Sequence, residues 1–175
     1  ACLVRSKPVC EYVFYKRNLN RATVAEFKIG YAPESGQALK TALLKRGFSE
    51  AELDAAGLLN RFKSDLFRNR MMIPFIDENG VVIGYTARVI DKGEPKYLNT
   101  PETIIFNKRK VLFGLDRAVS SINREGFVIV VEGYMDAISL VSAGVTNVVA
   151  TLGTAFTEDH IKILKRYSKK IVFCY

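Results

Sequence analysis

The chain has 175 residues, of which 49% are hydrophobic, enough for one medium-sized domain or two small domains with a buried core. Its formal net charge of +8 favours an anionic partner, with nucleic acid first among the possibilities. No apolar run approaches the ~20 residues that span a bilayer, and no secretory signal is recognisable, so we expect a soluble, cytoplasmic protein that does not bind membranes.

The first third of the chain predicts a small helical scaffold. Residues 1–17 carry only a short apolar patch and give no clear signal. Asn20 is a favourable N-cap for a helix over residues 22–28, and a second amphipathic helix follows it. Ser49 and Glu52 have the spacing of a capping box, which predicts the start of a third helix.

The middle of the chain predicts a β-hairpin. Residues 71–76 and 81–90 are apolar strands, and the Asp-Glu-Asn-Gly sequence between them is typical of a tight turn. On the return strand, Gly84, Thr86 and Arg88 share one face because side chains alternate between the two faces of a strand. We expect this face, with its small residues, to let a backbone or a phosphate approach closely.

The same region is basic. Between residues 61 and 117 there are 11 basic and 7 acidic side chains, whereas from residue 118 to 175 there are 6 and 5. An ordinary solvated surface would also explain this surplus. The candidates for binding nucleic acid or nucleotide are Arg61, Arg68, Arg70, Arg88, Lys96, Tyr97, Asn99 and Lys108.

The last third has a regular βαβαβ pattern. Strands at 127–131, 147–151 and 171–175 alternate with helices, which predicts a parallel sheet with right-handed crossovers. The fold class is therefore α/β, with a mixed α+β subdomain at residues 1–115 followed at 116–175 by a parallel sheet that stops at its third strand. The unpaired edge of that strand predicts self-association of the chain.

Two carboxylates and a polar turn lie where such a sheet binds ligands. Glu132 follows the first parallel strand, Gly133 permits a tight turn, and Asp136 lies on the first turn of the next helix. Gly153 and Thr154 follow the second strand, where amides and hydroxyls can contact a phosphate. The alternative is that Glu132 is a solvated loop residue and Asp136 only a favourable charge near a helix N-terminus.

The Glu132-Gly133-Tyr134-Met135-Asp136 segment resembles the first motif of the Toprim domain. Other segments resemble the bacterial replicative DNA primase of the DnaG type, and they occur in the order of that family. They include Arg68-Asn69-Arg70 with the apolar strand after it, the Lys96-Tyr97-Leu98-Asn99-Thr100-Pro101-Glu102-Thr103 stretch, and residues 61–62, 84–88, 112–115 and 150–155.

This resemblance implies the RNA-polymerase core of a primase, a mixed α/β subdomain followed by a Toprim fold. The family is a nucleotidyltransferase, a DNA-directed RNA polymerase of the primosome that synthesises short RNA primers during DNA replication. The implied partners are single-stranded DNA template, ribonucleoside triphosphates, the RNA primer–DNA hybrid and, through a domain not present here, the replicative helicase. The implied cofactor is Mg²⁺ or Mn²⁺, bound by Glu132 and Asp136, which are also the catalytic candidates. The basic residues and the Gly153-Thr154 turn would bind template and nucleotide.

One departure from the family pattern limits the expected activity. The second acidic motif of the family, Asp-x-Asp, should begin directly after Tyr175 and is absent. We therefore expect this fragment alone to be inactive. With one histidine and three cysteines that lack a CxxC pair, we also expect no zinc in this segment.

Two other functions stay open. One is another Toprim nucleic-acid enzyme, a topoisomerase or nuclease that uses the same acidic pair, and the other is a non-catalytic DNA-binding module. A primer-synthesis assay, or the residues that follow Tyr175, would discriminate among the three.

Overall fold

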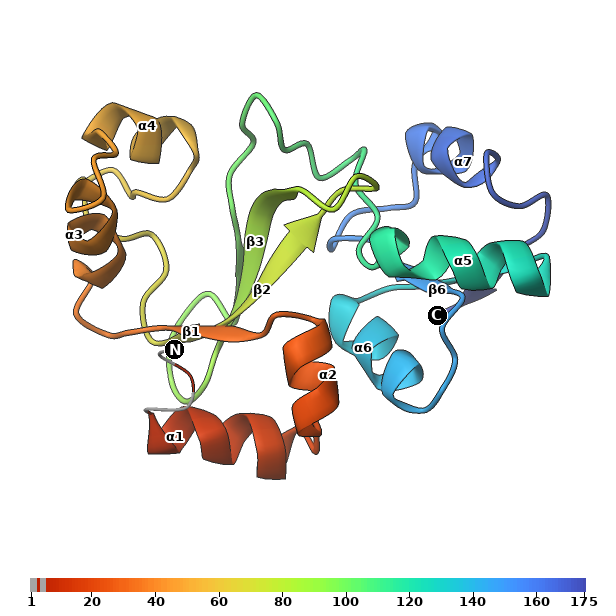
Figure 1. The fold of residues 1–175 in the computed structure, drawn as a ribbon, viewed down its shortest axis with the longest axis horizontal. Coiled ribbons are helices and arrows are strands. Elements are labelled where there is room, and N and C mark those ends of the chain that lie inside the picture. Colours follow the sequence, from red (N-terminus) through yellow and green to blue (C-terminus); the bar gives the residue numbers. More distant parts are fainter. Residues whose placement is uncertain (1–2, 4–5) are drawn as a thin grey trace. The chain divides into compact units, whose positions relative to one another are not determined.

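A computed structural model of the chain describes residue 3 and residues 6–175 (Figure 1). The chain forms two compact units. The first comprises Ala1–Pro74 and Gly84–Phe106, and the second comprises Phe75–Ile83 and Asn107–Tyr175. The functional division that the sequence predicts at residues 115 and 116 stays a prediction. Within the described residues, no helix is both long enough and apolar enough to cross a membrane.

The first unit contains the helical scaffold that the sequence predicts. Asn20 caps the first predicted helix, its side-chain oxygen accepting from the Thr23 amide at 2.8 Å. Ser49 and Glu52 form the expected capping box, in which the Glu52 carboxylate accepts from the Ser49 amide at 2.7 Å. These three helices are α2 (Arg21–Glu26), α3 (Ala38–Leu44) and α4 (Glu50–Ala55).

A further helical segment precedes them, over residues whose sequence carries no clear signal. It consists of α1 (Lys7–Cys10) and the π-helix η2 (Glu11–Lys16). Val9 and Val13 are fully buried, whereas Tyr15 is 83% exposed, so the segment is amphipathic over only a few turns. A π-helix shifts the spacing of the buried face away from the 3.6-residue period, which explains why the sequence pattern gave no clear helical signal.

An antiparallel sheet follows, with the strand order β1-β2-β3-β4. Its strands are β1 (Gly30–Ala32), β2 (Arg70–Ile76), β3 (Val82–Val89) and β4 (Tyr97–Asn99). The predicted hairpin is confirmed: the Gly80 amide donates to the Asp77 carbonyl at 3.0 Å, and Gly80 has the left-handed φ of +81° that this turn requires.

The face of β3 that carries Gly84 and Thr86 is not open, and the expectation that a phosphate approaches there was wrong. A Cβ atom added to Gly84 would lie 3.3 Å from the ring of Phe106 and 3.4 Å from Thr100. Thr86 and Phe106 are themselves buried. The small residue at position 84 therefore makes room for an aromatic side chain of the same unit.

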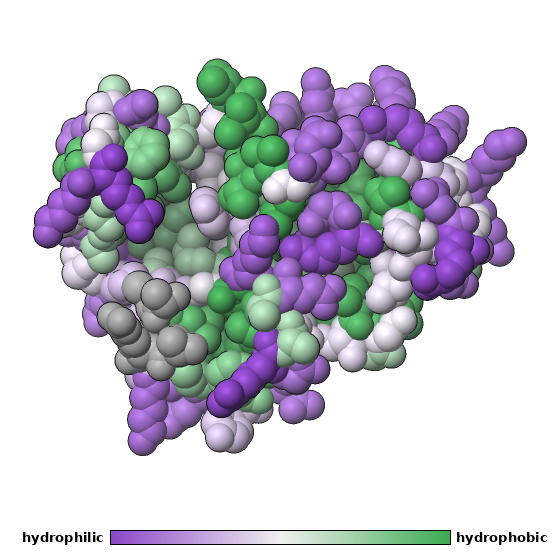
Figure 2. Space-filling view, in the orientation of Figure 1, coloured by the Kyte–Doolittle hydropathy of each residue, from purple (hydrophilic) through white to green (hydrophobic). Residues whose placement is uncertain are grey.

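Phe106 anchors the loop that follows β4. Its amide donates to the Thr103 hydroxyl at 3.0 Å, while the preceding Ile104 and Ile105 are 98% and 58% exposed. Figure 2 shows an apolar projection at the upper edge of the face in view, against a mostly hydrophilic surface. The loop thus buries one aromatic ring and leaves two aliphatic side chains in solvent.

The second unit confirms the predicted parallel sheet. Its strands are β5 (Val128–Val131), β6 (Val148–Ala150) and β7 (Ile171–Cys174), parallel and in the order β6-β5-β7. In Figure 1, α5 (Leu115–Glu125) and α7 (Glu158–Leu164) lie on one side of this sheet and α6 (Tyr134–Ser142) on the other. The core between the sheet and α5 and α7 is built from Leu112, Leu115, Ala118, Ile122, Val128, Val130, Val149 and Leu164.

The register brings the carboxyl ends of the three strands to one edge. Val131 of β5 is aligned with Ala150 of β6 and with Cys174 of β7. The residues that follow, Glu132 and Thr151, therefore lie next to each other. The side chains of Val172 and Phe173 on β7, and of Tyr175 directly after it, are exposed, and self-association through this strand stays a prediction.

Candidate active site and nucleic-acid surface

One of the two acidic residues of the candidate site, Asp136, lies over the glycine that follows the other, Glu132. Glu132 follows β5 and is exposed, and α6 begins two residues later with its Asp136 amide donating to the Gly133 carbonyl at 3.1 Å. A Cβ atom added to Gly133 would lie 3.0 Å from Asp136 Oδ2. The Asp136 carboxylate therefore folds back over residue 133, and any side chain at position 133 would crowd it.

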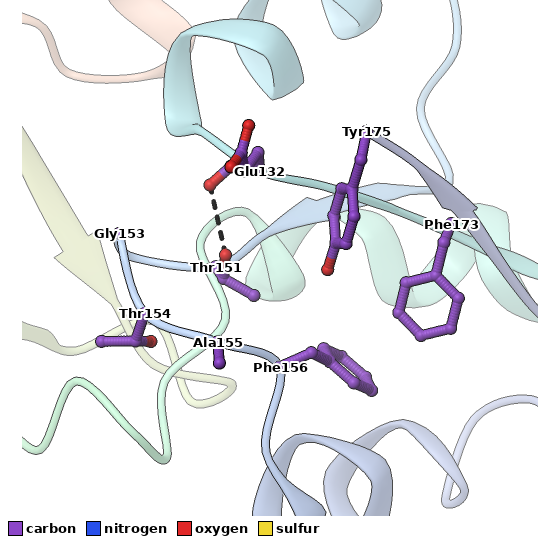
Figure 3. A pocket seen from close by; sticks show the side chains of 8 residues that line it. All are labelled: Glu132, Thr151, Gly153, Thr154, Ala155, Phe156, Phe173 and Tyr175. Carbon is purple, nitrogen blue, oxygen red and sulfur yellow. Dashed lines mark hydrogen bonds between the residues drawn. The ribbon is translucent and has the colours of Figure 1, made fainter.

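A cavity of about 610 Å³ opens beside Glu132 (Figure 3). The Thr151 hydroxyl donates to the backbone carbonyl of Glu132 at 3.2 Å, which ties the ends of β5 and β6 together. Asp136 is not among the residues that line the cavity, although Glu132, Gly153 and Thr154 are, as the sequence led us to expect of one site. The full lining is Glu132, Thr151, Gly153, Thr154, Ala155, Phe156, Phe173 and Tyr175.

The cavity is also lined by three aromatic side chains that the sequence did not lead us to expect. The rings of Phe156 and Phe173 have centroids 5.0 Å apart, and those of Phe173 and Tyr175 are 5.7 Å apart. Partial burial and the negative charge of Glu132 raise the pKa of the Tyr175 hydroxyl. The spacing of Phe173 and Tyr175 at the end of β7 was a detectable signal, because residues two apart in an extended segment share a face.

The turn after β6 carries a buried hydroxyl. Gly153 adopts a left-handed φ of +70°, which a side chain would disfavour. The Oγ1 atom of Thr154 is buried and has no hydrogen-bond partner within the part of the chain that the structure describes. A buried hydroxyl without a partner is costly, so a water molecule or a ligand atom would satisfy it.

The donor set fits a hard divalent cation held mainly by water and substrate. Within residues 3 and 6–175, no group of three or more His, Cys, Asp or Glu side chains could hold a metal ion. Glu132 and Asp136 supply carboxylate oxygens, and Mg²⁺ is commonly bound by one or two carboxylates while it keeps several waters and contacts substrate phosphates. The acidic pair therefore fits Mg²⁺ or Mn²⁺ and does not form a complete cage.

In the first unit, three of the predicted residues form one cluster around an aromatic ring. The Arg88 guanidinium carbon lies 4.8 Å and the Lys96 ammonium 5.8 Å from the centroid of Tyr97, which is 44% exposed. Arg88 also donates to the Tyr97 hydroxyl. This contact follows from the sheet, since Arg88 of β3 pairs with Tyr97 of β4; Asn99 of the same strand pairs with Thr86 and is half-buried.

Arg70 lies elsewhere than its predicted role suggests. Arg70 is only 6% exposed, and its Nη1 atom donates to the Pro95 carbonyl at 2.7 Å. Pro95 directly precedes Lys96. Arg70 therefore supports the backbone that carries the Tyr97 cluster.

The other predicted basic residues are exposed and lie apart from this cluster in the chain. Arg68 lies over Gly36, where an added Cβ would be 2.6 Å from the Arg68 Cδ atom. The Arg61 guanidinium carbon lies 4.7 Å from the ring centroid of Phe62. Lys108 belongs to the second unit, in a loop fixed by the Thr157 hydroxyl, which donates to the Arg109 carbonyl at 2.8 Å.

Two family models match the chain. Residues 3–119 match the N-terminal domain of the DNA primase catalytic core, and residues 129–175 match a Toprim-like domain. The first match alone covers more than half of the chain.

The chain belongs to the DNA primase catalytic core family.

Curated DNA primases confirm the assignment. The chain is 47% identical over 165 residues to the DNA primase of Clostridium acetobutylicum. The aligned region covers 93% of this chain and 28% of that primase. It is 42% identical to the DNA primase of Synechococcus elongatus, covering 91% of this chain and 24% of that one. This primase segment thus spans about a quarter of the length of the curated relatives it matches.

Solved primase structures have the same fold. The zinc-binding and RNA polymerase domains of the Aquifex aeolicus primase match with a TM-score of 0.91 and 40% identity, covering 99% of this chain and 43% of that one. The RNA polymerase domain of Mycobacterium tuberculosis DnaG matches with a TM-score of 0.88 and 34% identity, covering 98% and 61%. A DnaG primase catalytic domain bound to single-stranded DNA matches with a TM-score of 0.84 and 38% identity, covering 97% and 56%.

Proposed function

We propose that this chain is part of a primase RNA polymerase domain, and that the whole protein synthesises short RNA primers on single-stranded DNA during replication. Residues 1–115 form its basic nucleic-acid-binding subdomain, and residues 116–175 form the start of its Toprim domain. The observation that carries this proposal is the acidic pair. Glu132 lines a cavity of about 610 Å³, and the Asp136 carboxylate lies over Gly133, the next residue in the chain, in a protein of the primase family.

The proposed cofactor site consists of the Glu132 and Asp136 carboxylates. Bound Mg²⁺ or Mn²⁺ supplies electrostatic stabilisation of the phosphates and a more acidic attacking hydroxyl. Glu132, which lines the cavity, is also placed to accept or return a proton at the attacking oxygen. Gly133 keeps position 133 free of a side chain, so that Asp136 can share the site.

The phosphate-binding roles fall to residues of both units. The Gly153 amide and the unpartnered Thr154 hydroxyl are suited to contact the triphosphate of an incoming ribonucleotide. Arg61, Arg68, Arg88, Lys96 and Lys108 are suited to neutralise the phosphates of template and triphosphate, with Arg70 supporting Lys96 and Asn99 adding an amide.

Known primases support DNA as the partner. The RNA polymerase domain of Mycobacterium tuberculosis DnaG has been solved in complex with double-stranded DNA, and a DnaG catalytic domain has been solved with single-stranded DNA. For the present chain we infer single-stranded template, ribonucleoside triphosphates and the RNA primer–DNA hybrid as ligands, with the replicative helicase bound through another part of the protein. Acting on a bacterial chromosome implies a cytoplasmic location.

We also propose that the 175-residue chain by itself binds DNA without polymerising. Two carboxylates with water make a weak site for Mg²⁺ in the absence of further acidic ligands. The basic residues of the first unit do not depend on that site for their phosphate contacts.

Primer synthesis by the complete polypeptide containing this segment tests the function. Ribonucleotide incorporation on single-stranded DNA should require Mg²⁺ or Mn²⁺, and Asp136→Asn should reduce it by about a hundredfold. The matched control is Asp159→Asn, which changes an acidic residue of α7 that does not line the cavity. This substitution should leave ribonucleotide incorporation unchanged. Strand cleavage in place of ribonucleotide incorporation would contradict the proposal and favour a nuclease or topoisomerase.

A further inference from the structure

Four aromatic side chains are exposed among the described residues of the first unit, and two of them carry a cation. Tyr15, Phe48, Phe62 and Tyr97 are 83%, 49%, 75% and 44% exposed. Arg61 lies over the ring of Phe62, and Arg88 and Lys96 lie over Tyr97. The two rings with cations are thus the two that lie beside predicted phosphate-binding residues.

Phe62 is presented by a rigid loop. The Asn60 side-chain oxygen accepts from the amides of Phe62 at 2.8 Å and of Ser64 at 3.3 Å, and its nitrogen donates to the Ser64 hydroxyl at 2.8 Å. The Asn60 and Lys63 amides donate to the Ser64 and Asn60 carbonyls, both at 2.9 Å. These bonds close the turn on itself, so little backbone freedom is left to lose on binding.

The base of this loop is also fixed. Leu59 pairs with Asp65 across the turn, and Asp65 is 3% exposed with its carboxylate accepting from the Leu39 and Lys40 amides at 2.8 and 2.9 Å. Lys63 adopts a left-handed φ of +56° and forms an ion pair with Asp54. The loop is anchored, yet it holds the Phe62 ring 75% exposed, so this ring contributes little packing to the fold. Its exposure is better explained by a binding role.

We propose that Phe62, with the Arg61 guanidinium on its ring, is a stacking platform for an unpaired base of single-stranded DNA. Aromatic rings stack on any base because every base has a π-face, and an adjacent arginine adds a cation–π contribution and attracts phosphate. Arg61 would then neutralise a phosphate of the DNA backbone, while the Phe62 ring would stack on the base. This inference rests on the proposed function and adds a residue outside the predicted site.

The absence of tryptophan from the chain gives a direct probe of stacking. Phe62→Trp places a single tryptophan in the 175-residue chain, whose fluorescence is titrated with an oligothymidylate of about 12 nucleotides. We expect quenching by the oligothymidylate and little by an abasic oligomer with the same number of phosphates. Tyr15→Trp, at an exposed ring without a cation, is the control and should show no base-dependent quenching.

Affinity measurements with labelled oligomers test the same contact without tryptophan. Phe62→Leu should weaken oligothymidylate binding by about tenfold and leave abasic binding unchanged, and Phe62→Tyr should restore it. The slope of log affinity against log salt should stay the same, since no phosphate contact is lost. Phe48→Leu should change neither affinity.

Two outcomes would overturn the inference. One is equal weakening of oligothymidylate and abasic binding by Phe62→Leu. The other is unquenched tryptophan fluorescence in a Phe62→Trp chain that still binds DNA with a steep salt dependence. Either would exclude stacking while leaving the proposed function intact. A chain that binds neither oligomer would contradict the proposed template surface itself, and the stacking platform with it.

Discussion

At the scale of single residues, two glycines, one in each unit, are explained by the charged side chains that lie over them. Gly133 leaves space for the Asp136 carboxylate, and Gly36 leaves space for the Arg68 side chain. In the sequence both positions are ordinary turn residues. In the structure an added methyl group would come within 3.0 Å of Asp136 and 2.6 Å of Arg68, so each glycine leaves room for a charged side chain.

Arg70 is the residue whose role the structure redefines most, because it is buried and donates to the Pro95 carbonyl. Arg70→Gln should weaken single-stranded DNA binding by displacing Lys96, and the loss of a hydrogen bond from a charged donor should cost about 1.5–3 kcal/mol of unfolding free energy. In a Lys96→Ala background the same substitution should weaken DNA binding no further. The measurements are urea unfolding and DNA affinity in the double-mutant cycle.

The matched control for this prediction is Arg68→Gln, which removes an exposed guanidinium. Its effect on DNA affinity should add to that of Lys96→Ala and should reduce the salt slope. If Arg70→Gln behaves in the same additive way, Arg70 contacts phosphate directly and the positioning role is wrong.

At the scale of elements, α7 is fixed at both ends. At its N-terminus Thr157 and His160 form a capping box, and the His160 Nδ1 atom accepts from the Thr157 amide at 3.2 Å. Just after its C-terminus, Arg166 and Tyr167 donate to the Glu78 carboxylate of the β2–β3 turn, at distances of 2.7–3.1 Å. The Tyr167 hydrogen bond, with a smaller contribution from Arg166, lowers the pKa of Glu78.

His160 makes the stability of this unit depend on pH. Burial lowers its pKa below the ordinary value of 6.5, against smaller opposing effects of the Val111 backbone and of the Asp159 charge. The unfolded chain therefore binds the proton more readily than the folded chain, and stability should be complete above about pH 6.5 and fall as the pH drops below it. Because the chain has one histidine, no other imidazole contributes to this change.

Urea unfolding at pH 7.5 and pH 5.5 checks this prediction. The original chain should have a lower midpoint at pH 5.5. His160→Gln keeps a side chain that can complete the capping box but does not titrate, so its midpoints should differ less between the two pH values. An equal difference in both proteins would assign the pH dependence to carboxylates instead.

At the scale of the whole molecule, the sequence predicted the parallel sheet, the hairpin and three helices, two of them capped, because each depends on local patterns. Ser49 with Glu52 and the apolar run before Glu132 are examples. The packing of Phe106 on Gly84 and the burial of Arg70 depend on contacts between residues 22 and 25 positions apart, which no local pattern records. The acidic pair was predictable because it lies within one local motif. The exposure of Phe62 and the place of Phe156 in the cavity were not predictable, because both depend on the folded chain.

The central claim is that Glu132 belongs to the chemistry of primer synthesis and not to DNA binding. Ribonucleotide incorporation and single-stranded DNA affinity should be measured together for the complete primase polypeptide, its Glu132→Gln variant and a Glu158→Gln control on α7. Glu132→Gln keeps the shape of the side chain but removes its charge, so incorporation should fall by about a hundredfold or more. DNA affinity should stay within about twofold, because the proposal assigns the phosphate contacts to basic residues. Near-normal incorporation by Glu132→Gln, in a preparation whose Glu158→Gln control is also active, would contradict the account.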